Sequence, residues 1–260
     1  RWSSVMATVK VIVATHKQYR MPMDEMYIPI QVGAQDRTPL GYVKDSDGEN
    51  ISAKNANYCE LTGLYWAWKN LDSDYLGMVH YRRHFTVERF GDKWNRILTM
   101  DQLKLLIEQC DIILPTPRNY FIETTYSQYA HAHHAIDLDL TREVLMNKYP
   151  NYLDAFDSCM ESTKGHKFNM FIMKRECLED YCTWLFDVLF ELEKRLDISA
   201  YSKNDARVFG FVSERLLDVW LEANHKGYRE IPVMFMEKQN WIIKSWNFLM
   251  RKLKSRNFDR

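Results

Sequence analysis

The stretch Tyr75-Leu-Gly-Met-Val-His-Tyr-Arg-Arg-His-Phe85 changes character at its midpoint. Its apolar half, Tyr75 to Val79, predicts a strand buried on both faces, as is typical of parallel sheets. The polar half carries two adjacent arginines, Arg82 and Arg83, among histidine and tyrosine side chains. Ligands of open α/β sheets bind beyond the carboxyl ends of the strands. Neighbouring arginines are costly to desolvate without an anion, so we interpret this turn as an anion site rather than an exposed basic turn.

The bulk composition excludes several classes of protein. The chain has 260 residues, a formal net charge of zero and five cysteines. A neutral chain has no global field that attracts nucleic acid, so no nucleic-acid partner is expected. An odd number of cysteines without a Cys-x-x-Cys motif indicates reduced thiols in a cytoplasmic protein rather than a disulfide framework or a zinc site. We find no secretory signal and no apolar run long enough to span a bilayer.

Strand and helix patterns alternate along the first half of the chain. Val9 to Ala14 is predicted to form a buried strand, and Ser52 or Asn55 is expected to cap a helix that runs to about Asn70. After the arginine-ended strand we expect a helix with Leu103, Leu106, Ile107 and Cys110 on one face, and then a strand from Asp111 to Leu114. This order predicts an α/β fold with a mainly parallel central sheet flanked by helices.

The second half is expected to begin with an irregular segment at 118–140. The elements predicted after it are helices at 142–148 and 152–161, a strand at 168–173, an amphipathic helix through Leu178 and Leu192, a helix within 205–223 that is interrupted near Gly210, and a short strand at 231–236. We expect a single compact domain at 9–238, preceded at 1–8 by an N-terminal extension or expression remnant and followed at 239–260 by a basic, aromatic C-terminal helix.

Two polar groups accompany the predicted strand and helix boundaries. Thr15, His16 and Lys17 follow the first strand, where they would meet a phosphate or stack on a base; a solvated turn explains them equally well. Asn55 and Asn57 stand at a helix start, where they would either cap the helix or favour a diphosphate at its N-terminus.

Histidines gather between Tyr129 and His134, ahead of Asp137 and Asp139. Three histidines and two carboxylates suit a divalent metal, but the spacing matches no familiar metal motif. We therefore favour a polar loop over a sugar, in which His131 or His134 donates to hydroxyl groups. Asn169 lies in a polar turn that leads into a strand, which is also the ordinary way for a strand to begin.

The segment from Phe209 to Leu217 places Ser213 and Glu214 where a helix is expected to begin. A carboxylate in the first turn of a helix usually does no more than interact favourably with the positive end of the helix dipole. At the mouth of a substrate cleft the same carboxylate could deprotonate an acceptor hydroxyl. The tail from Trp241 to Lys254 mixes aromatic and basic residues, which suits either an interfacial helix on an anionic membrane or a helix packed on protein.

Long motifs in this chain resemble those of one bacterial family. They are 14–17, 50–52, 57–70, 79–83, 168–172 and 207–217, and the likeness extends from Val9 to about Val233. The family was long filed as a domain of unknown function and occurs in capsular and exopolysaccharide gene clusters. Its characterised members are glycosyltransferases, associated with galactofuranosyl transfer from a uridine-diphosphate donor.

The resemblance implies a GT-A-like nucleotide-sugar-binding fold. Such folds normally hold a metal against the diphosphate with an Asp-x-Asp motif at the end of a central strand. In this chain the turn at 80–83 takes that place, whereas Asp72-Ser-Asp74 precedes the strand and is interpreted as a loop. Arg82 and Arg83, helped by Lys17, would then neutralise the diphosphate without a cofactor, and Mn²⁺ or Mg²⁺ is the less favoured option.

The resemblance also implies roles for other residues. Glu214 would act as the base of an inverting reaction. The predicted substrate contacts are Thr15, His16, Lys17, Asn55, Asn57, His80, Tyr81, His84, His131, His134, Asn169 and Ser213.

The implied reaction is transfer of a sugar, with galactofuranose as the best guess, from a UDP-sugar to a glycan or lipid-linked glycan in capsular, exopolysaccharide or O-antigen assembly. The protein would be cytoplasmic, with a peripheral contact at the inner face of the membrane through its C-terminal helix. Two alternatives remain: a metal-dependent hydrolase that uses the His131 to His134 region, and a sugar-nucleotide or glycan-binding module without turnover.

Overall fold

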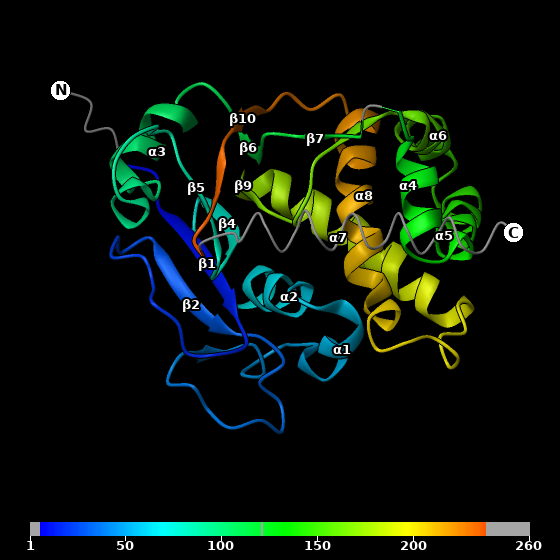
Figure 1. The fold of residues 1–260 in the computed structure, drawn as a ribbon, viewed down its shortest axis with the longest axis horizontal. Coiled ribbons are helices and arrows are strands. Elements are labelled where there is room, and N and C mark those ends of the chain that lie inside the picture. The colour runs from blue at the N-terminus through cyan, green and yellow to red at the C-terminus, as the bar shows by residue number, and fades with distance from the viewer. Residues whose placement is uncertain (1–5, 121, 238–260) are drawn as a thin grey trace, which may run out of the picture.

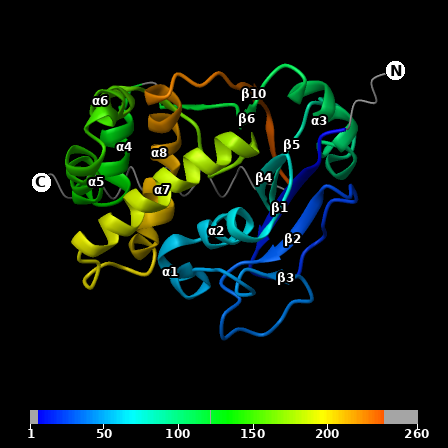
Figure 2. The ribbon, with the colours of Figure 1, turned by 180° about the vertical axis from the view of Figure 1, so that it is seen from behind.

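The computed structural model describes residues 6–120 and 122–237. Within them a nine-stranded mixed sheet forms the centre, and its main path runs β10-β6-β9-β4-β1-β2-β3 (Figures 1 and 2). The strands of this path are β1 (Val9–Thr15), β2 (Tyr27–Gln31), β3 (Val43–Lys44), β4 (Tyr75–His80), β6 (Ile112–Pro115), β9 (Phe171–Lys174) and β10 (Arg229–Ile231). The remaining two, β5 (Arg83–Phe85) and β11 (Val233–Phe235), pair with each other beside the end of β4.

The predicted parallel sheet is confirmed. β4 pairs with β1 in parallel register, β1 pairs with β2 in the same sense, and β10 runs parallel to β6. β9 is the antiparallel strand on the path and lies between β4 and β6. Residues Tyr75 to Val79 are all buried, as expected for a strand that is covered on both faces.

Helices cover the sheet unequally. The α-helices are α1 (Asn55–Tyr58), α2 (Leu61–Asn70), α3 (Met100–Ile107), α4 (Thr125–Ala132), α5 (Ala135–Lys148), α6 (Leu153–Glu161), α7 (Arg175–Arg195) and α8 (Val208–Ala223). Figure 1 shows α4, α5, α6 and α8 together at one end of the molecule, with α3 at the other. Four 3₁₀ turns are described: η1 (Ser52–Lys54), η2 (Lys93–Arg96), η3 (Pro150–Tyr152) and η4 (Asp205–Arg207).

Alternation along the strands creates two apolar cores, one on each face of the sheet. Ile12 of β1 and Met78 of β4 join the core beneath α2, α7 and α8. Val11 and Val13 of β1 point the other way, into a core that includes Leu103 of α3. Successive side chains of a strand point to opposite faces, so a single strand feeds both cores.

Several predicted boundaries are wrong. The segment expected to be irregular contains α4 and the start of α5, because Thr124 caps α4 by accepting a hydrogen bond from the Ser127 N–H. The helix expected to run to Asn70 is broken at Cys59, whose φ is 53°, a left-handed conformation. Neither Ser52 nor Asn55 caps a helix: the Ser52 hydroxyl donates to Asp45.

The predicted interruption at Gly210 is also wrong, since α8 runs through it without a break. A β-carbon at position 210 would lie 3.2 Å from the Cys59 Sγ and 3.5 Å from the Tyr58 carbonyl oxygen. Glycine therefore serves close packing of α8 against α1 rather than a bend. The tail predicted to be helical lies outside the described residues. None of the described helices is long and apolar enough to cross a membrane.

Candidate active site

A cavity of about 540 Å³ opens at the carboxyl ends of β1 and β4. Parallel pairing fixes its position, because Ala14 lies opposite His80 and the two strands end side by side. The Tyr81 N–H donates to the Ala14 carbonyl oxygen at 3.1 Å, which ties the arginine turn to β1. The wall consists of Ala14, Thr15, His16, Val32, Arg37, Asn55, Ala56, Cys59, Glu60, His80, Tyr81, Arg82, Arg83, Lys203, Ala206 and Arg207.

The cavity wall is strongly cationic. Among its described residues it contains four arginines and one lysine, but Glu60 is the single carboxylate. The whole chain carries no net charge, so this excess is local. A cleft lined by charges of one sign concentrates ligands of the opposite sign. The site therefore suits an anion with several charges, such as a diphosphate.

Arg83 has the most unusual environment in the wall. Its guanidinium lies over the Phe168 ring at 4.5 Å and the Phe235 ring at 5.4 Å. Burial and the adjacent Arg82 charge lower its pKa, although Glu214 and Glu60 oppose this. Within 6–120 and 122–237, no carboxylate lies within ion-pairing distance of Arg83. A half-buried arginine without a carboxylate partner is costly until an anion binds it.

Arg82, in contrast, already has a carboxylate partner. Its Nη1 lies 3.4 Å from Glu237 Oε2, and its guanidinium lies 5.0 Å from the centre of the Tyr81 ring. The same tyrosine packs edge-on against His16 at 5.4 Å and lies 5.6 Å from Lys17 Nζ. Tyr81 thus holds the two strand ends and their cationic side chains together.

Glu60 and His80 form a largely buried polar pair in the cavity wall. His80 Nε2 lies 3.9 Å from Glu60 Oε1, and Asn169 Nδ2 donates to the same oxygen at 2.9 Å. Burial raises the pKa of Glu60 and lowers the pKa of His80 to about 4. Asn169 and Phe168 both have positive φ, at 51° and 75°. Strained backbone of this kind concentrates at functional sites.

Glu214 lies beside the cavity without lining it. It belongs to the second turn of α8, so the prediction that it stands at a helix start is wrong. Its Oε2 is 3.6 Å from Arg215 Nη1. Its charge counteracts the lowering of the pKa of both His80 and Arg83, which places the carboxylate near the arginine turn. Burial lowers the pKa of the neighbouring Lys167 to about 8, and Glu214 opposes that change as well.

Three predicted contact residues do not line the cavity. His84 is fully buried between the Tyr27 and Trp94 rings, and burial lowers its pKa to about 4. Ser213 is fully buried in α8, beside Tyr181. Asn57 donates to the Ala206 carbonyl oxygen at 2.7 Å and so ties α1 to η4. We therefore do not retain these side chains as substrate contacts.

The histidines at the end of α4 also lie apart from the cavity. His131 is 72% exposed and pairs with Glu123, whereas His134 pairs with Asp205 and stacks on Tyr201. The side chains described at 6–120 and 122–237 include no group of three or more His, Cys, Asp or Glu that could hold a metal ion. Asp74 accepts hydrogen bonds from Thr8 at the amino end of β4, so Asp72-Ser-Asp74 is the loop that we predicted.

Two other predicted residues line the cavity, but their polar groups are hydrogen-bonded to the neighbouring backbone. Thr15 lines the cavity, but its hydroxyl donates to the Lys17 carbonyl oxygen at 2.7 Å and shapes the turn. Asn55 also lines it, while its amide donates to the Cys59 carbonyl oxygen. The sequence-based prediction missed Arg37, Glu60, Lys203 and Arg207. Glu60 and Arg207 fall within the motifs at 57–70 and 207–217, whereas Arg37 and Lys203 lie in loops with no local signal.

Comparison with known proteins assigns the fold. No curated protein matches the sequence. The family described as Domain of unknown function (DUF4422) matches residues 10–225. A solved structure, the apo form of the bifunctional glycosyltransferase WbbM, superposes with a TM-score of 0.82 at 27% identity.

That match covers 89% of this chain but 46% of the WbbM chain, so this chain spans about half the length of that chain. The expected glycosyltransferase-type α/β fold is thereby confirmed. The chain belongs to the DUF4422 family, and it shares its fold with a glycosyltransferase.

Proposed function

We propose that this protein is a glycosyltransferase that moves a sugar from a UDP-sugar donor to a glycan acceptor. One observation carries the proposal: in a fold shared with a glycosyltransferase, the carboxyl ends of β1 and β4 meet at a cationic cavity that contains Arg83, an arginine with no carboxylate partner among the residues that the structure describes. The leaving group of a nucleotide-sugar reaction is a diphosphate, and its charge increases as the glycosidic bond breaks. Fixed cations at that point stabilise the transition state more than the ground state.

The arginine turn supplies these cations in our proposal. Arg83 and Arg82 bind the diphosphate oxygens, and Arg207 approaches them from η4 across the cavity. Guanidinium groups suit this task because they form paired, charge-assisted hydrogen bonds with phosphate oxygens. His16 and Tyr81 offer ring surfaces for the uracil base beside the end of β1. No step in this scheme requires a metal ion.

Glu214 is our candidate for the base. Its carboxylate takes the proton from an acceptor hydroxyl, whose oxygen attacks the anomeric carbon while the bond from that carbon to the diphosphate oxygen breaks. Direct displacement inverts the configuration at that carbon. Glu60 is the competing carboxylate, because it lines the cavity and burial raises its pKa. Its hydrogen bond from Asn169 supports a positioning role instead.

The finer identity of the substrates is also part of the proposal. The sequence motifs favour galactofuranose as the sugar and a glycan of capsular, exopolysaccharide or O-antigen assembly as the acceptor. A lipid-linked acceptor would place the reaction at the inner face of the cytoplasmic membrane, where the basic aromatic tail could make a peripheral contact.

Transfer assays with UDP-galactofuranose and other UDP-sugars test this function. We expect wild-type turnover to persist in excess EDTA. We expect Glu214→Gln to reduce kcat by about 10²–10⁴-fold, the usual contribution of a general base. Glu60→Gln should reduce it less, since it retains a partner for Asn169. Wild-type turnover by Glu214→Gln would overturn the assignment of the base, and activity that returns only with Mn²⁺ or Mg²⁺ would overturn the arginine mechanism.

A further inference from the structure

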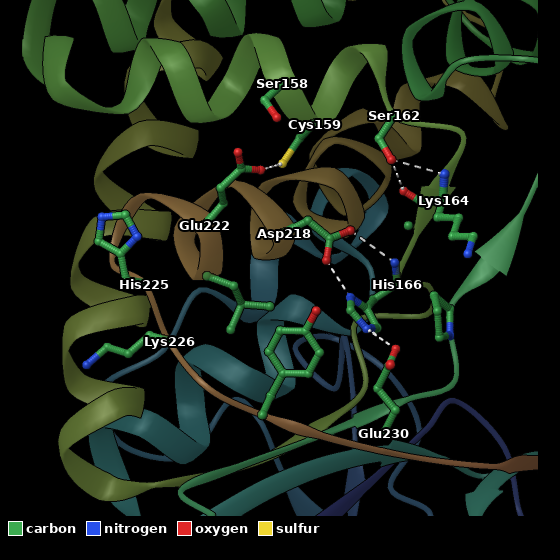
Figure 3. Close-up of a pocket in the computed structure, with 14 residues that line it drawn as sticks. Ser158, Cys159, Ser162, Lys164, His166, Asp218, Glu222, His225, Lys226 and Glu230 are labelled. Carbon is green, nitrogen blue, oxygen red and sulfur yellow. Dashed lines mark hydrogen bonds and ion pairs between the residues drawn. The ribbon is translucent and has the colours of Figure 1, made fainter.

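A second cavity of about 580 Å³ lies at the far end of α8 (Figure 3). Its wall comes from the last turns of α8, the end of α6, strand β8 (Lys164–Gly165) and strand β10. β8 pairs with β7 (Arg118–Asn119) in a separate small sheet. We call the cavity at the carboxyl ends of β1 and β4 the donor site. None of the residues that line it also lines the second cavity.

His166 fixes the shape of this second cavity. Figure 3 shows its ring between two carboxylates from different elements. The ring Nδ1 and the backbone N–H both bond to Asp218 of α8, and Nε2 lies 2.8 Å from Glu230 Oε2 of β10. Burial alone would lower the pKa of His166, but the two carboxylates outweigh it and the net pKa is raised. The imidazolium thus locks the loop after β8 to α8 and to the sheet.

The chemistry of this wall differs from that of the donor site. Asp218, Glu222 and Glu230 supply carboxylate oxygens, Lys164 and Lys226 supply ammonium groups, and Ser158 supplies a hydroxyl, so this wall carries charges of both signs. Tyr228 is 43% exposed and packs edge-on against the His166 ring at 5.2 Å. The wall thus combines hydrogen-bond acceptors with an accessible aromatic ring. Ligands with many hydroxyl donors and some exposed C–H surface match such a wall, because each hydroxyl finds an acceptor and the C–H face packs on the ring.

Helix α8 connects the two cavities. Glu214 lies near the arginine turn, while Asp218 and Glu222, four and eight residues further on, reach the second cavity. Residues four apart lie on one face of a helix, and eight residues rise by about 12 Å. Glu214 and Asp218 both act to raise the pKa of Tyr120, whose main cause is burial, so both carboxylates lie near this one side chain. The candidate base and one wall of the second cavity are thus carried by the same helix.

We infer that the second cavity binds a neutral saccharide unit of the acceptor glycan, some distance from the hydroxyl that reacts. The inference rests on the proposed function, because it takes the acceptor to be a glycan. Binding a remote unit would orient the acceptor, so the site should affect the KM for the acceptor more than that for the donor. The three carboxylates of the wall are offset by Lys164, Lys226 and the paired His166, so the site suits a neutral saccharide unit better than a charged one.

Saccharide binding tests the inference without requiring turnover. Wild-type protein is mixed with a panel of neutral and uronate-containing di- to tetrasaccharides, and binding is measured by saturation-transfer difference NMR and titration. We expect neutral members to bind and Tyr228→Ala to raise their Kd by about tenfold. Glu222→Ala, a substitution on the exposed side of α8, should also weaken binding if Tyr228→Ala fails to fold. Tyr126→Ala is the matched control, because Tyr126 lines neither cavity.

The results separate the inference from the proposed function. Absence of binding by every neutral saccharide, or an unchanged Kd in folded Tyr228→Ala and Glu222→Ala variants, would overturn the inference even if UDP-sugar turnover is intact. Saccharide binding that depends on Tyr228, in a protein that neither binds UDP nor transfers sugar, would support the glycan site and overturn the transferase. In an active enzyme we expect Tyr228→Ala to raise the acceptor KM by about tenfold with little change in the donor KM.

Discussion

The requirements of folding do not explain the surroundings of the Arg83 charge. Its guanidinium is half-buried between two phenylalanine rings, and no described carboxylate pairs with it. Proteins rarely leave a charge in this condition unless a ligand completes the site. Removal of this charge should therefore preserve or raise the stability of the free protein and lower its affinity for an anion.

The variant Arg83→Met tests that opposition. Methionine packs well between aromatic rings, so we expect the free protein to unfold at an equal or higher temperature than wild type. Loss of charge-assisted hydrogen bonds should raise the Kd for UDP by about 10–100-fold, equivalent to about 1.5–3 kcal/mol. Differential scanning fluorimetry and calorimetric titration measure the two quantities, with the exposed Arg89→Met as control. A large loss of stability with unchanged UDP affinity would show that Arg83 is merely structural.

At the scale of the element, the loop from β8 to β9 is held from two sides. His166 ties it to Asp218 and Glu230, and Asn169 ties it to Glu60 in the wall of the donor cavity. Two consecutive residues of the loop, Phe168 and Asn169, have positive φ. This backbone is strained, so the ion pairs of His166 and the hydrogen bond of Asn169 must stabilise it.

The ion pairs of His166 predict a pH-dependent stability. The folded-state pKa of His166 is raised above its unfolded value of about 6.5. The contribution of these ion pairs to the free energy of unfolding is therefore complete below about pH 6.5, and it disappears as the pH rises through the folded-state pKa. We expect His166→Gln to lower the free energy of unfolding by about 2 kcal/mol at pH 5.5–6 and by clearly less at pH 9.

Urea unfolding of both proteins at each pH measures that difference. The control is His131→Gln, since His131 is exposed and surface ion pairs contribute little. A difference in unfolding free energy that stays constant, or grows, from pH 6 to pH 9 would contradict a charged His166.

At the scale of the whole molecule, the charge is segregated although the total is zero. The donor cavity gathers four arginines and a lysine around one carboxylate, whereas the second cavity sets three carboxylates against two lysines. A bound diphosphate lies in a local positive field, and a neutral saccharide depends little on any field. The two sites should therefore differ in their sensitivity to salt.

We expect the Kd for UDP to rise several-fold between 50 and 300 mM NaCl, because the screening length shortens over this range. Binding of uridine, which has no phosphate, is the control and should change little. Calorimetric titrations at each salt concentration provide the measurement. Equal salt dependence for UDP and uridine would contradict diphosphate recognition by the cationic cavity.

The sequence determined the character of the central strands and the type of fold. Tyr75 to Val79 is apolar throughout, and such a run is stable only where both faces are covered; burial of all five residues follows. The arginine turn could be placed at a strand end because the polarity changes abruptly along neighbouring residues. Both are local properties, and parallel pairing brings the ends of β1 and β4 to one edge of the sheet.

Tertiary structure alone decided which side chains share a cavity. Arg37 and Lys203 reach the donor site from loops far apart in the sequence, and no local pattern distinguishes them from other surface cations. Ser213 and His84 look like site residues in the sequence, but each is buried in the core. Gly210 looks like an interruption, yet it is where α8 and α1 pack closely. These outcomes depend on contacts between elements. The periodicity of a single helix or strand shows which of its faces is buried, but it does not show which other element packs against that face.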